Sequence, residues 1–295
     1  MDIYGIIGYP IKHSLSPAMH NAAFKELGID AEYKLFEVKP EELEDFLLNR
    51  KDVIGFNITI PHKVRALEIL KKRYPFTATG KMVEEDLYYV KLSGAINTVK
   101  KIGDTIEYRN TDSHGFLKSL EVDLKFEPKN KSILLIGCGG AGRAVIAGLS
   151  WKNIGVKKIY IYDLNDEAIV LGKLHFSSLP QWESYLENKI EFILKGQIEN
   201  RIKNCHLLVN ASSLGMKEGD ISPIDKKLLR KDLFVYDVVY NRETQLIKDA
   251  NEIGCKAVGG KGMLLYQGVG AFEFWTGKKA PVEVMKKALS KALDR

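Results

Sequence analysis

The sequence predicts an α/β protein of two domains, one of them a doubly wound parallel sheet. The chain has 295 residues, which is enough for two domains of ordinary size. Short apolar runs that are typical of buried strands alternate with helical patterns along most of the chain. One strand-turn-helix-strand segment carries the spacing G-x-G-x-x-G, which is common at the first turn of such sheets.

The first region predicts strands at 3–7, 33–38 and 53–60, with helices between them. Serine is a favoured N-cap and proline fits the first helical turn, so Ser16 predicts a helix over 17–27. The sequence around Pro40 begins another helix in the same way. We expect 125–131 to be a linker because this stretch contains proline and asparagine.

The second region begins with the glycine motif, between predicted strands at 133–136 and 159–162. Gly137 permits a tight turn, Gly139 lets backbone N–H groups approach a pyrophosphate, and Gly142 lets helix and strand pack closely. The helix over 143–151 would place its positive end at the phosphates. A tight turn without a ligand is the alternative interpretation.

Asp163 ends the second strand of this unit, where a carboxylate can accept hydrogen bonds from ribose hydroxyls. The same charge would repel a 2′-phosphate, and no arginine follows directly. We therefore predict that the cofactor is NAD in preference to NADP. Capping of the next helix by Asp163 is the alternative.

Further strands are predicted at 192–194, 207–210, 234–239 and 257–258, so the second region continues as a doubly wound sheet. The pattern is helical from Gly262 to the end, and Pro281 begins the last helix. We expect these helices to fold back on the first region or to bridge both regions.

Composition excludes several classes of protein. The formal charge of +6 comes from dispersed lysines, so we expect no nucleic-acid surface. Three separated cysteines and six histidines show neither a disulfide framework nor a metal-ligand spacing, and we predict no metal. No apolar stretch could span a bilayer and the N-terminus is no signal peptide, which favours a cytoplasmic protein.

Lys63 and Asp112 are the strongest candidates for proton transfer in the first region. Lys63 follows a strand that ends at Pro61, and a lysine is unfavourable at a helix start unless it has another task. If the two side chains meet, they can hold one mobile proton beside an alcohol or carbonyl group. The alternatives are a surface lysine and an N-cap aspartate for a helix that begins at His114.

Three other segments are candidates for binding. Ser14 and Ser16 offer hydroxyls beside the free N–H groups of a helix, which suits a small carboxylate, although N-capping would explain Ser16 equally well. Residues 210–216 follow a strand and should line a cofactor cleft, unless they are only a polar turn. Residues 259–263, with Gln267 one turn later, would close the site or form a flexible connection.

Together these motifs resemble the shikimate dehydrogenase family, including its quinate/shikimate branch. The matching segments occur in the order of the family: 13–17 with His20 and Asn21, 57–63, 94–98, 110–112, 137–141, 210–216, 237–240 and 262–267. The resemblance implies NAD(P)-dependent interconversion of 3-dehydroshikimate and shikimate, a step of aromatic amino-acid (chorismate) biosynthesis.

The resemblance also implies roles for individual residues. The catalytic pair would be Lys63 and Asp112. The substrate ligands would be Ser14, Ser16, Thr59, Lys63, Asn97, Asp112, Tyr240 and Gln267. The cofactor would contact Gly137, Gly139, Gly140, Ala141, Gly142, Asp163, Val238 and Gly260.

The expected domains are a substrate-binding catalytic domain, 1–112 completed by the helices of 262–295, and a Rossmann dinucleotide-binding domain, 113–261. Two features depart from the family. Asp163-Leu164-Asn165 stands where most members carry an Asn-Arg-Thr-like segment for NADP, and the stretch between Lys63 and Asn97 is longer than expected, with no role assigned.

Alternative functions stay open. A quinate/shikimate dehydrogenase of quinate catabolism is the nearest one, and Ser16 favours shikimate slightly. A shikimate-sensing regulatory protein without catalysis is the alternative of another class, and retention of Lys63 and Asp112 argues against it. We expect a small-molecule substrate, and a chain that is a monomer or a homodimer.

Overall fold

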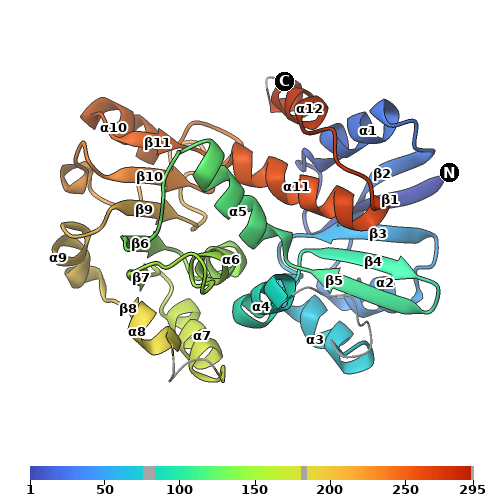
Figure 1. The fold of residues 1–295 in the computed structure, drawn as a ribbon, viewed down its shortest axis with the longest axis horizontal. Coiled ribbons are helices and arrows are strands. Elements are labelled where there is room, and N and C mark those ends of the chain that lie inside the picture. The colour runs from blue at the N-terminus through green and yellow to red at the C-terminus, as the bar shows by residue number, and fades with distance from the viewer. Residues whose placement is uncertain (76–83, 181–184, 294–295) are drawn as a thin grey trace. The chain divides into compact units, whose positions relative to one another are not determined.

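The chain folds into two compact units. The computed structural model describes residues 1–75, 84–180 and 185–293 (Figure 1). Unit 1 comprises residues 1–115 and 265–295, and unit 2 comprises residues 116–264. The predicted domain boundaries, after residues 112 and 261, lie a few residues before these. The expected linker at 125–131 lies inside unit 2, so that expectation is wrong.

Unit 1 contains a five-stranded mixed sheet with the order β2-β1-β3-β4-β5. Its strands are β1 (Asp2–Gly8), β2 (Ala31–Glu37), β3 (Val53–Ile58), β4 (Thr98–Ile102) and β5 (Thr105–Arg109). β1 runs parallel to β2 and β3, whereas β4 is antiparallel to both β3 and β5. The sequence did not predict the hairpin of β4 and β5, because charged residues interrupt its apolar pattern.

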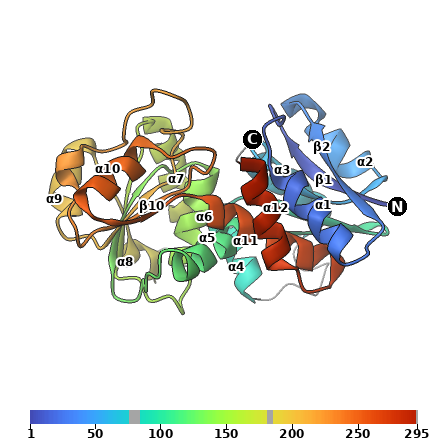
Figure 2. The ribbon, with the colours of Figure 1, turned by 90° about the horizontal axis from the view of Figure 1, so that it is seen from above.

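Helices cover both faces of this sheet. The helices that lie wholly in unit 1 are α1 (Ser16–Glu26), η1 (Pro40–Glu42), α2 (Leu43–Asn49), α3 (Lys63–Arg73), α4 (Glu84–Ser93) and α12 (Val282–Leu293). Two more helices, α5 (Thr111–Val122) and α11 (Lys261–Thr276), begin in one unit and end in the other. On one face, side chains of α2, α3 and α4 pack against the sheet, around Phe56. On the other face, Tyr4 packs against Phe24 of α1 and Trp275 of α11. α12 lies beside α1 (Figures 1 and 2).

Two boundaries in unit 1 differ from the sequence prediction. α1 begins at Ser16, and no side chain caps it, so the N-cap interpretation of Ser16 is wrong. α5 begins at Thr111 instead of His114, and the Asn110 side chain accepts the Asp112 N–H, at 3.1 Å. Asp112 therefore does not cap this helix, and its carboxylate is available for another partner.

Unit 2 contains a six-stranded parallel sheet with the order β11-β10-β9-β6-β7-β8. Its strands are β6 (Ser132–Ile136), β7 (Lys158–Tyr162), β8 (Ile190–Phe192), β9 (Leu207–Asn210), β10 (Phe234–Asp237) and β11 (Lys256–Val258). Counted from β6, this is the doubly wound order 3-2-1-4-5-6, as the sequence predicts. The order reverses between β6 and β9.

The helices of unit 2 are α6 (Gly140–Leu149), α7 (Asp166–Ser177), α8 (Glu187–Lys189), η3 (Lys195–Gln197), α9 (Ile198–Ile202), η4 (Lys226–Leu228) and α10 (Gln245–Ile253). α9 and α10 pack on one face of the sheet, and on the other Tyr236 contacts Phe116 of α5. α6 begins at Gly140, earlier than the predicted Arg143, so the helix starts within the glycine motif.

The register of each sheet brings polar chain segments together. In unit 1, Ile7 pairs with Ile58, and Thr98 pairs with Arg109. Thr59, Asn97 and the first residues of α5 therefore lie at the same edge of the sheet. In unit 2, Ile136 pairs with both Tyr162 and Asn210, which places the ends of β6, β7 and β9 at one edge. In the described part of the chain, no helix is long and apolar enough to cross a membrane.

Candidate functional site

Lys63 and Asp112 meet in unit 1. The Lys63 Nζ atom lies 2.5 Å from Asp112 Oδ2, and the two side chains are only 16% and 8% exposed. Lys63 is the first residue of α3 and Asp112 lies in the first turn of α5. The interpretation of Lys63 as an ordinary surface lysine is therefore wrong. An ammonium group at this helix start is stabilised by the carboxylate rather than by the helix dipole.

Asn97 holds the second oxygen of Asp112. Its Nδ2 atom donates to Asp112 Oδ1 at 2.8 Å, and its Oδ1 atom accepts the Thr111 N–H at 2.7 Å. The same amide lies 3.4 Å from the Oε1 atom of Gln267. All of these side chains are buried, so each hydrogen bond fixes the orientation of the next group. One oxygen of Asp112 is thus directed at Lys63.

Buried polar side chains form a hydrogen-bond network next to Asn97, and the sequence assigned no role to this network. Tyr33 donates its hydroxyl hydrogen to Asn57 Oδ1 at 2.7 Å. Asn57 Nδ2 donates to the Asn97 main-chain oxygen at 3.2 Å and to Thr98 Oγ1 at 3.0 Å. The sequence does contain a signal for this network, because Asn57 is a polar residue between apolar neighbours of a buried strand.

The other expected substrate ligands of unit 1 lie in nearby chain segments. Ser16 is buried at the start of α1, and its N–H donates to Ser14 Oγ at 3.4 Å. Thr59 follows β3, and its N–H donates to the Ile7 main-chain oxygen at 2.9 Å. Tyr240 belongs to unit 2, where burial raises the pKa of its phenol.

The three glycines of the motif in unit 2 are required for different reasons. Gly137 has φ +104, and a Cβ there would overlap the backbone of Ala211 and Ser212. A Cβ at Gly142 would overlap the carbonyl oxygen of Gly137. A Cβ at Gly139 would have no protein atom within 4 Å, and its φ of −73 suits any residue. Packing within the protein therefore explains Gly137 and Gly142 but not Gly139.

Asp163 is attached to the glycine loop. Its Oδ2 atom accepts the Cys138 N–H at 2.7 Å, and its Oδ1 atom accepts the Asn165 N–H at 2.9 Å. The cap of α7 is Asn165, whose side chain accepts the Glu167 N–H. The interpretation of Asp163 as a helix cap is therefore wrong. Asp166 and Glu167 add two more carboxylates directly after it.

Hydrogen bonds also order the loops that follow β9 and β10. Asp237 is fully buried and accepts from Asn210 Nδ2 at 2.9 Å and from Thr244 Oγ1 at 2.6 Å. Burial raises the pKa of Asp237, and these hydrogen bonds partly offset the effect. Gly260 lies so close to Val238 that a Cβ there would overlap the Val238 carbonyl oxygen. The expected cofactor residues Val238 and Gly260 thus adjoin each other.

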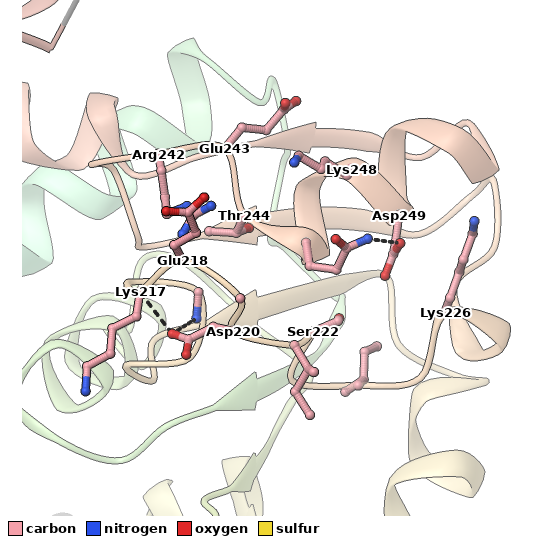
Figure 3. Close-up of a pocket in the computed structure, with 15 residues that line it drawn as sticks. Lys217, Glu218, Asp220, Ser222, Lys226, Arg242, Glu243, Thr244, Lys248 and Asp249 are labelled. Carbon is pink, nitrogen blue, oxygen red and sulfur yellow. Dashed lines mark hydrogen bonds between the residues drawn. The ribbon is translucent and has the colours of Figure 1, made fainter. Parts of the chain in front are cut away.

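A surface cavity of about 720 Å³ opens beside these loops (Figure 3). Figure 3 shows Asp220 accepting N–H groups from its own loop, and Asp249 paired with a neighbouring side chain. The charged residues that line it are Lys217, Glu218, Asp220, Lys226, Arg242, Glu243, Lys248 and Asp249. The lining includes neither the glycine loop nor Asp163, and its positive and negative charges are equal in number.

The described residues contain no group of three or more histidine, cysteine or acidic side chains that could hold a metal ion. Gly140 and Ala141 are the first two residues of α6, which begins four residues after β6 ends. Such a helix start suits phosphate groups.

Two family models match the chain. The model described as the shikimate dehydrogenase substrate binding domain matches residues 6–99, and that described as the shikimate 5′-dehydrogenase C-terminal domain matches residues 260–289.

Relatives match over nearly the whole chain. The shikimate dehydrogenase (NADP(+)) of Methanopyrus kandleri is 36% identical, over 98% of this chain and 94% of its own. The protein of the same name from Methanococcus maripaludis is 38% identical, over 98% and 96%. The crystal structure of shikimate 5-dehydrogenase from Listeria monocytogenes with shikimate and NAD has a TM-score of 0.81 at 31% identity, over 98% and 96%. The chain therefore belongs to the shikimate dehydrogenase family.

Proposed function

We propose that the protein is a dehydrogenase that interconverts shikimate and 3-dehydroshikimate with a nicotinamide cofactor, in the biosynthesis of chorismate and the aromatic amino acids. The observation that carries the proposal is the buried ion pair of Lys63 and Asp112, with Asn97 on its second carboxylate oxygen. Family membership and the relatives named for this activity support the choice of substrate.

The proposed roles follow from this geometry. When bound, the nicotinamide supplies or accepts the hydride at the ring carbon that carries the reacting oxygen. Lys63 gives its proton to that oxygen during reduction and takes it back during oxidation. Asp112 keeps Lys63 oriented and accepts a hydrogen bond from a ring hydroxyl. Because both side chains are largely buried, the charges act with little screening by water.

Other ligands surround the substrate in this proposal. The hydroxyls of Ser14 and Ser16 bind its carboxylate, beside the start of α1. The ring hydroxyls are bound by Thr59, Asn97, Gln267 and Tyr240. Asn97 and Gln267 are supported by their contact with each other and, for Asn97, with Asp112.

The glycine loop fits a dinucleotide. Open space beside Gly139 leaves room for a pyrophosphate at the start of α6, where backbone N–H groups are free to bind it. Gly137, Gly140, Ala141 and Gly142 shape the same turn. Val238 and Gly260 are the proposed neighbours of the nicotinamide.

We propose that NAD is preferred to NADP. Cys138 and Asn165 hold the Asp163 carboxylate, which has further lone pairs for the ribose hydroxyls. A 2′-phosphate would meet the charges of Asp163, Asp166 and Glu167 within one short segment. The two curated relatives are named for NADP(+), whereas the Listeria monocytogenes protein was solved with NAD, so the family includes proteins associated with each cofactor.

A cytoplasmic location is also proposed, because the three cysteines are buried and unpaired, as expected in a reducing compartment.

The test is the initial rate of oxidation of shikimate and of quinate by the purified protein, each with NAD and with NADP, followed by nicotinamide absorbance. We expect the fastest turnover with shikimate and NAD. Faster turnover of quinate would identify a quinate dehydrogenase, and higher kcat/KM with NADP would contradict the role of Asp163. Binding of shikimate without turnover in any combination would favour a sensor.

A further inference from the structure

A series of hydrogen bonds connects Tyr33 with the Lys63–Asp112 pair, and several contacts hold Tyr33 in place. Its side chain is 2% exposed on β2, the edge strand of the sheet in unit 1. Asn21 binds the Tyr33 backbone at both ends: its Oδ1 accepts the N–H at 2.8 Å and its Nδ2 donates to the carbonyl oxygen at 3.0 Å. The His20 ring stacks on the Tyr33 ring, with centroids 4.4 Å apart. Backbone hydrogen bonds and ring stacking together restrict the orientation of the phenol.

The direction of each hydrogen bond from Tyr33 can be assigned. The main-chain oxygen of Asn97 only accepts, so the amide nitrogen of Asn57 must face it. The Asn57 Oδ1 atom then faces Tyr33, which donates to it. Burial raises the pKa of Tyr33 well above its ordinary value, so the phenol keeps this proton.

The chain of hydrogen bonds continues to the ion pair. Asn57 donates to Thr98 Oγ1 at 3.0 Å, and that hydroxyl donates to Asn97 Oδ1 at 3.1 Å. Asn97 in turn donates to Asp112. The orientation of the Asn97 amide thus depends on a group that Tyr33 orients, although Tyr33 contacts neither Lys63 nor Asp112 in any hydrogen bond of the described residues.

We propose that Tyr33 is a positioning residue, whose hydroxyl fixes the Asn57 amide and thereby the Asn97 amide that aligns Asp112 with Lys63. This inference rests on the proposed function, because it concerns the efficiency of the same reaction.

The experiment compares Tyr33→Phe with wild type in shikimate oxidation. The variant keeps the ring that stacks on His20 and loses one oxygen atom. We expect kcat to fall about tenfold, because a small misplacement of a catalytic group is costly. The KM for the dinucleotide should stay within about twofold, since the proposed dinucleotide site lies in unit 2.

Tyr108→Phe is the matched control. Tyr108 is also a buried tyrosine of unit 1, and its hydroxyl donates to the Tyr74 main-chain oxygen at 2.8 Å, away from the ion pair. It should lose comparable thermal stability and retain both kcat and KM. Asn57→Ala removes the amide to which Tyr33 donates, and it should lower kcat at least as much as Tyr33→Phe does. This second variant keeps the test valid if one of the two proteins folds poorly.

The outcomes separate the two proposals. If the wild-type protein is active and Tyr33→Phe has the same kcat and KM, the positioning role is overturned and the proposed function is left intact. Equal loss of kcat in Tyr33→Phe and Tyr108→Phe would also overturn it, since the effect would then be one of stability. Wild type inactive on shikimate would overturn the proposed function, and the positioning role with it.

Discussion

The candidate sites of the two units are built in different ways. In unit 1, side chains contact side chains: Lys63, Asp112 and Asn97 are each oriented by the next, and all are largely buried. In unit 2, the glycine loop is formed by backbone and by space that side chains leave free, with Asp163 as its one ordered carboxylate. Substitutions that remove side-chain atoms should therefore impair the first site, whereas substitutions that add a side chain should impair the second.

This difference fits the proposed role of each site. A proton must be exchanged at one position, which requires a titratable side chain in a fixed place. A pyrophosphate can be held by N–H groups that every residue carries, provided that nothing obstructs them.

The largest effect is expected for Lys63→Ala. Loss of the proton donor should lower kcat by about a thousandfold, within the range for general acid-base catalysis. Lys72→Ala, which removes an exposed lysine from the same helix, is the control and should retain wild-type kcat. Near-normal turnover of Lys63→Ala would contradict the proposed mechanism.

Alanine at Gly142 and at Gly139 should have opposite consequences. At Gly142 the added Cβ overlaps the Gly137 backbone, so we expect the free energy of unfolding to fall by about 3 kcal/mol. At Gly139 the methyl group meets no protein atom, so stability should hold while the KM for the dinucleotide rises. Urea unfolding and initial rates measure the two effects. A Gly139→Ala protein with unchanged dinucleotide KM would show that the loop does not bind the phosphates.

His20 should make unit 1 sensitive to acid. Burial lowers its pKa from 6.5 to about 3, and neither ring nitrogen has a hydrogen-bond partner among the described residues. The unfolded chain therefore binds this proton below pH 6.5 while the folded chain does not, so stability falls as the pH drops from 6.5 toward 3. At pH 4.5 the loss should be about 2 to 3 kcal/mol.

The variant His20→Phe, which keeps a ring beside Tyr33, should lack this part of the pH dependence. The measurement is the free energy of unfolding at pH 7.5 and pH 4.5. His114→Ala, at an exposed histidine, should behave like wild type. If His20→Phe lost as much stability between the two pH values as wild type, the burial of a neutral His20 would not be the cause.

The smallest effect is expected for Asp163→Asn. Removing this charge should lower the ratio of kcat/KM for NAD to that for NADP by about tenfold, because the ribose loses its ionic acceptor and a 2′-phosphate meets less repulsion. Asp166→Asn removes an equal charge nearby without touching the glycine loop. If the ratio of kcat/KM for NAD to that for NADP changed equally in both variants, the cause would be the summed negative charge of this segment rather than contact between the cofactor and Asp163.

The sequence predicted much of this arrangement. The doubly wound sheet, the glycine motif and the strand that ends just before Asp163 follow from apolar runs of strand length and from local turn chemistry. The hairpin of β4 and β5 did not follow, because Lys100 and Lys101 obscure its alternation. The stretch between Lys63 and Asn97 is longer than expected, and in it the structure shows α3 and α4. Residues 76–83, between these two helices, lie outside the described residues.

Motif spacing was enough to identify the candidate residues, because it places Lys63, Asn97 and Asp112 at the ends of elements. Their partners could be identified only in the folded chain: Lys63 contacts Asp112, Asn165 rather than Asp163 caps α7, and Tyr33 and Asn57 belong to the hydrogen-bond network that leads to the pair. Element ends depend on local interactions, whereas the partner of a buried polar group depends on strand register and on segments distant in sequence.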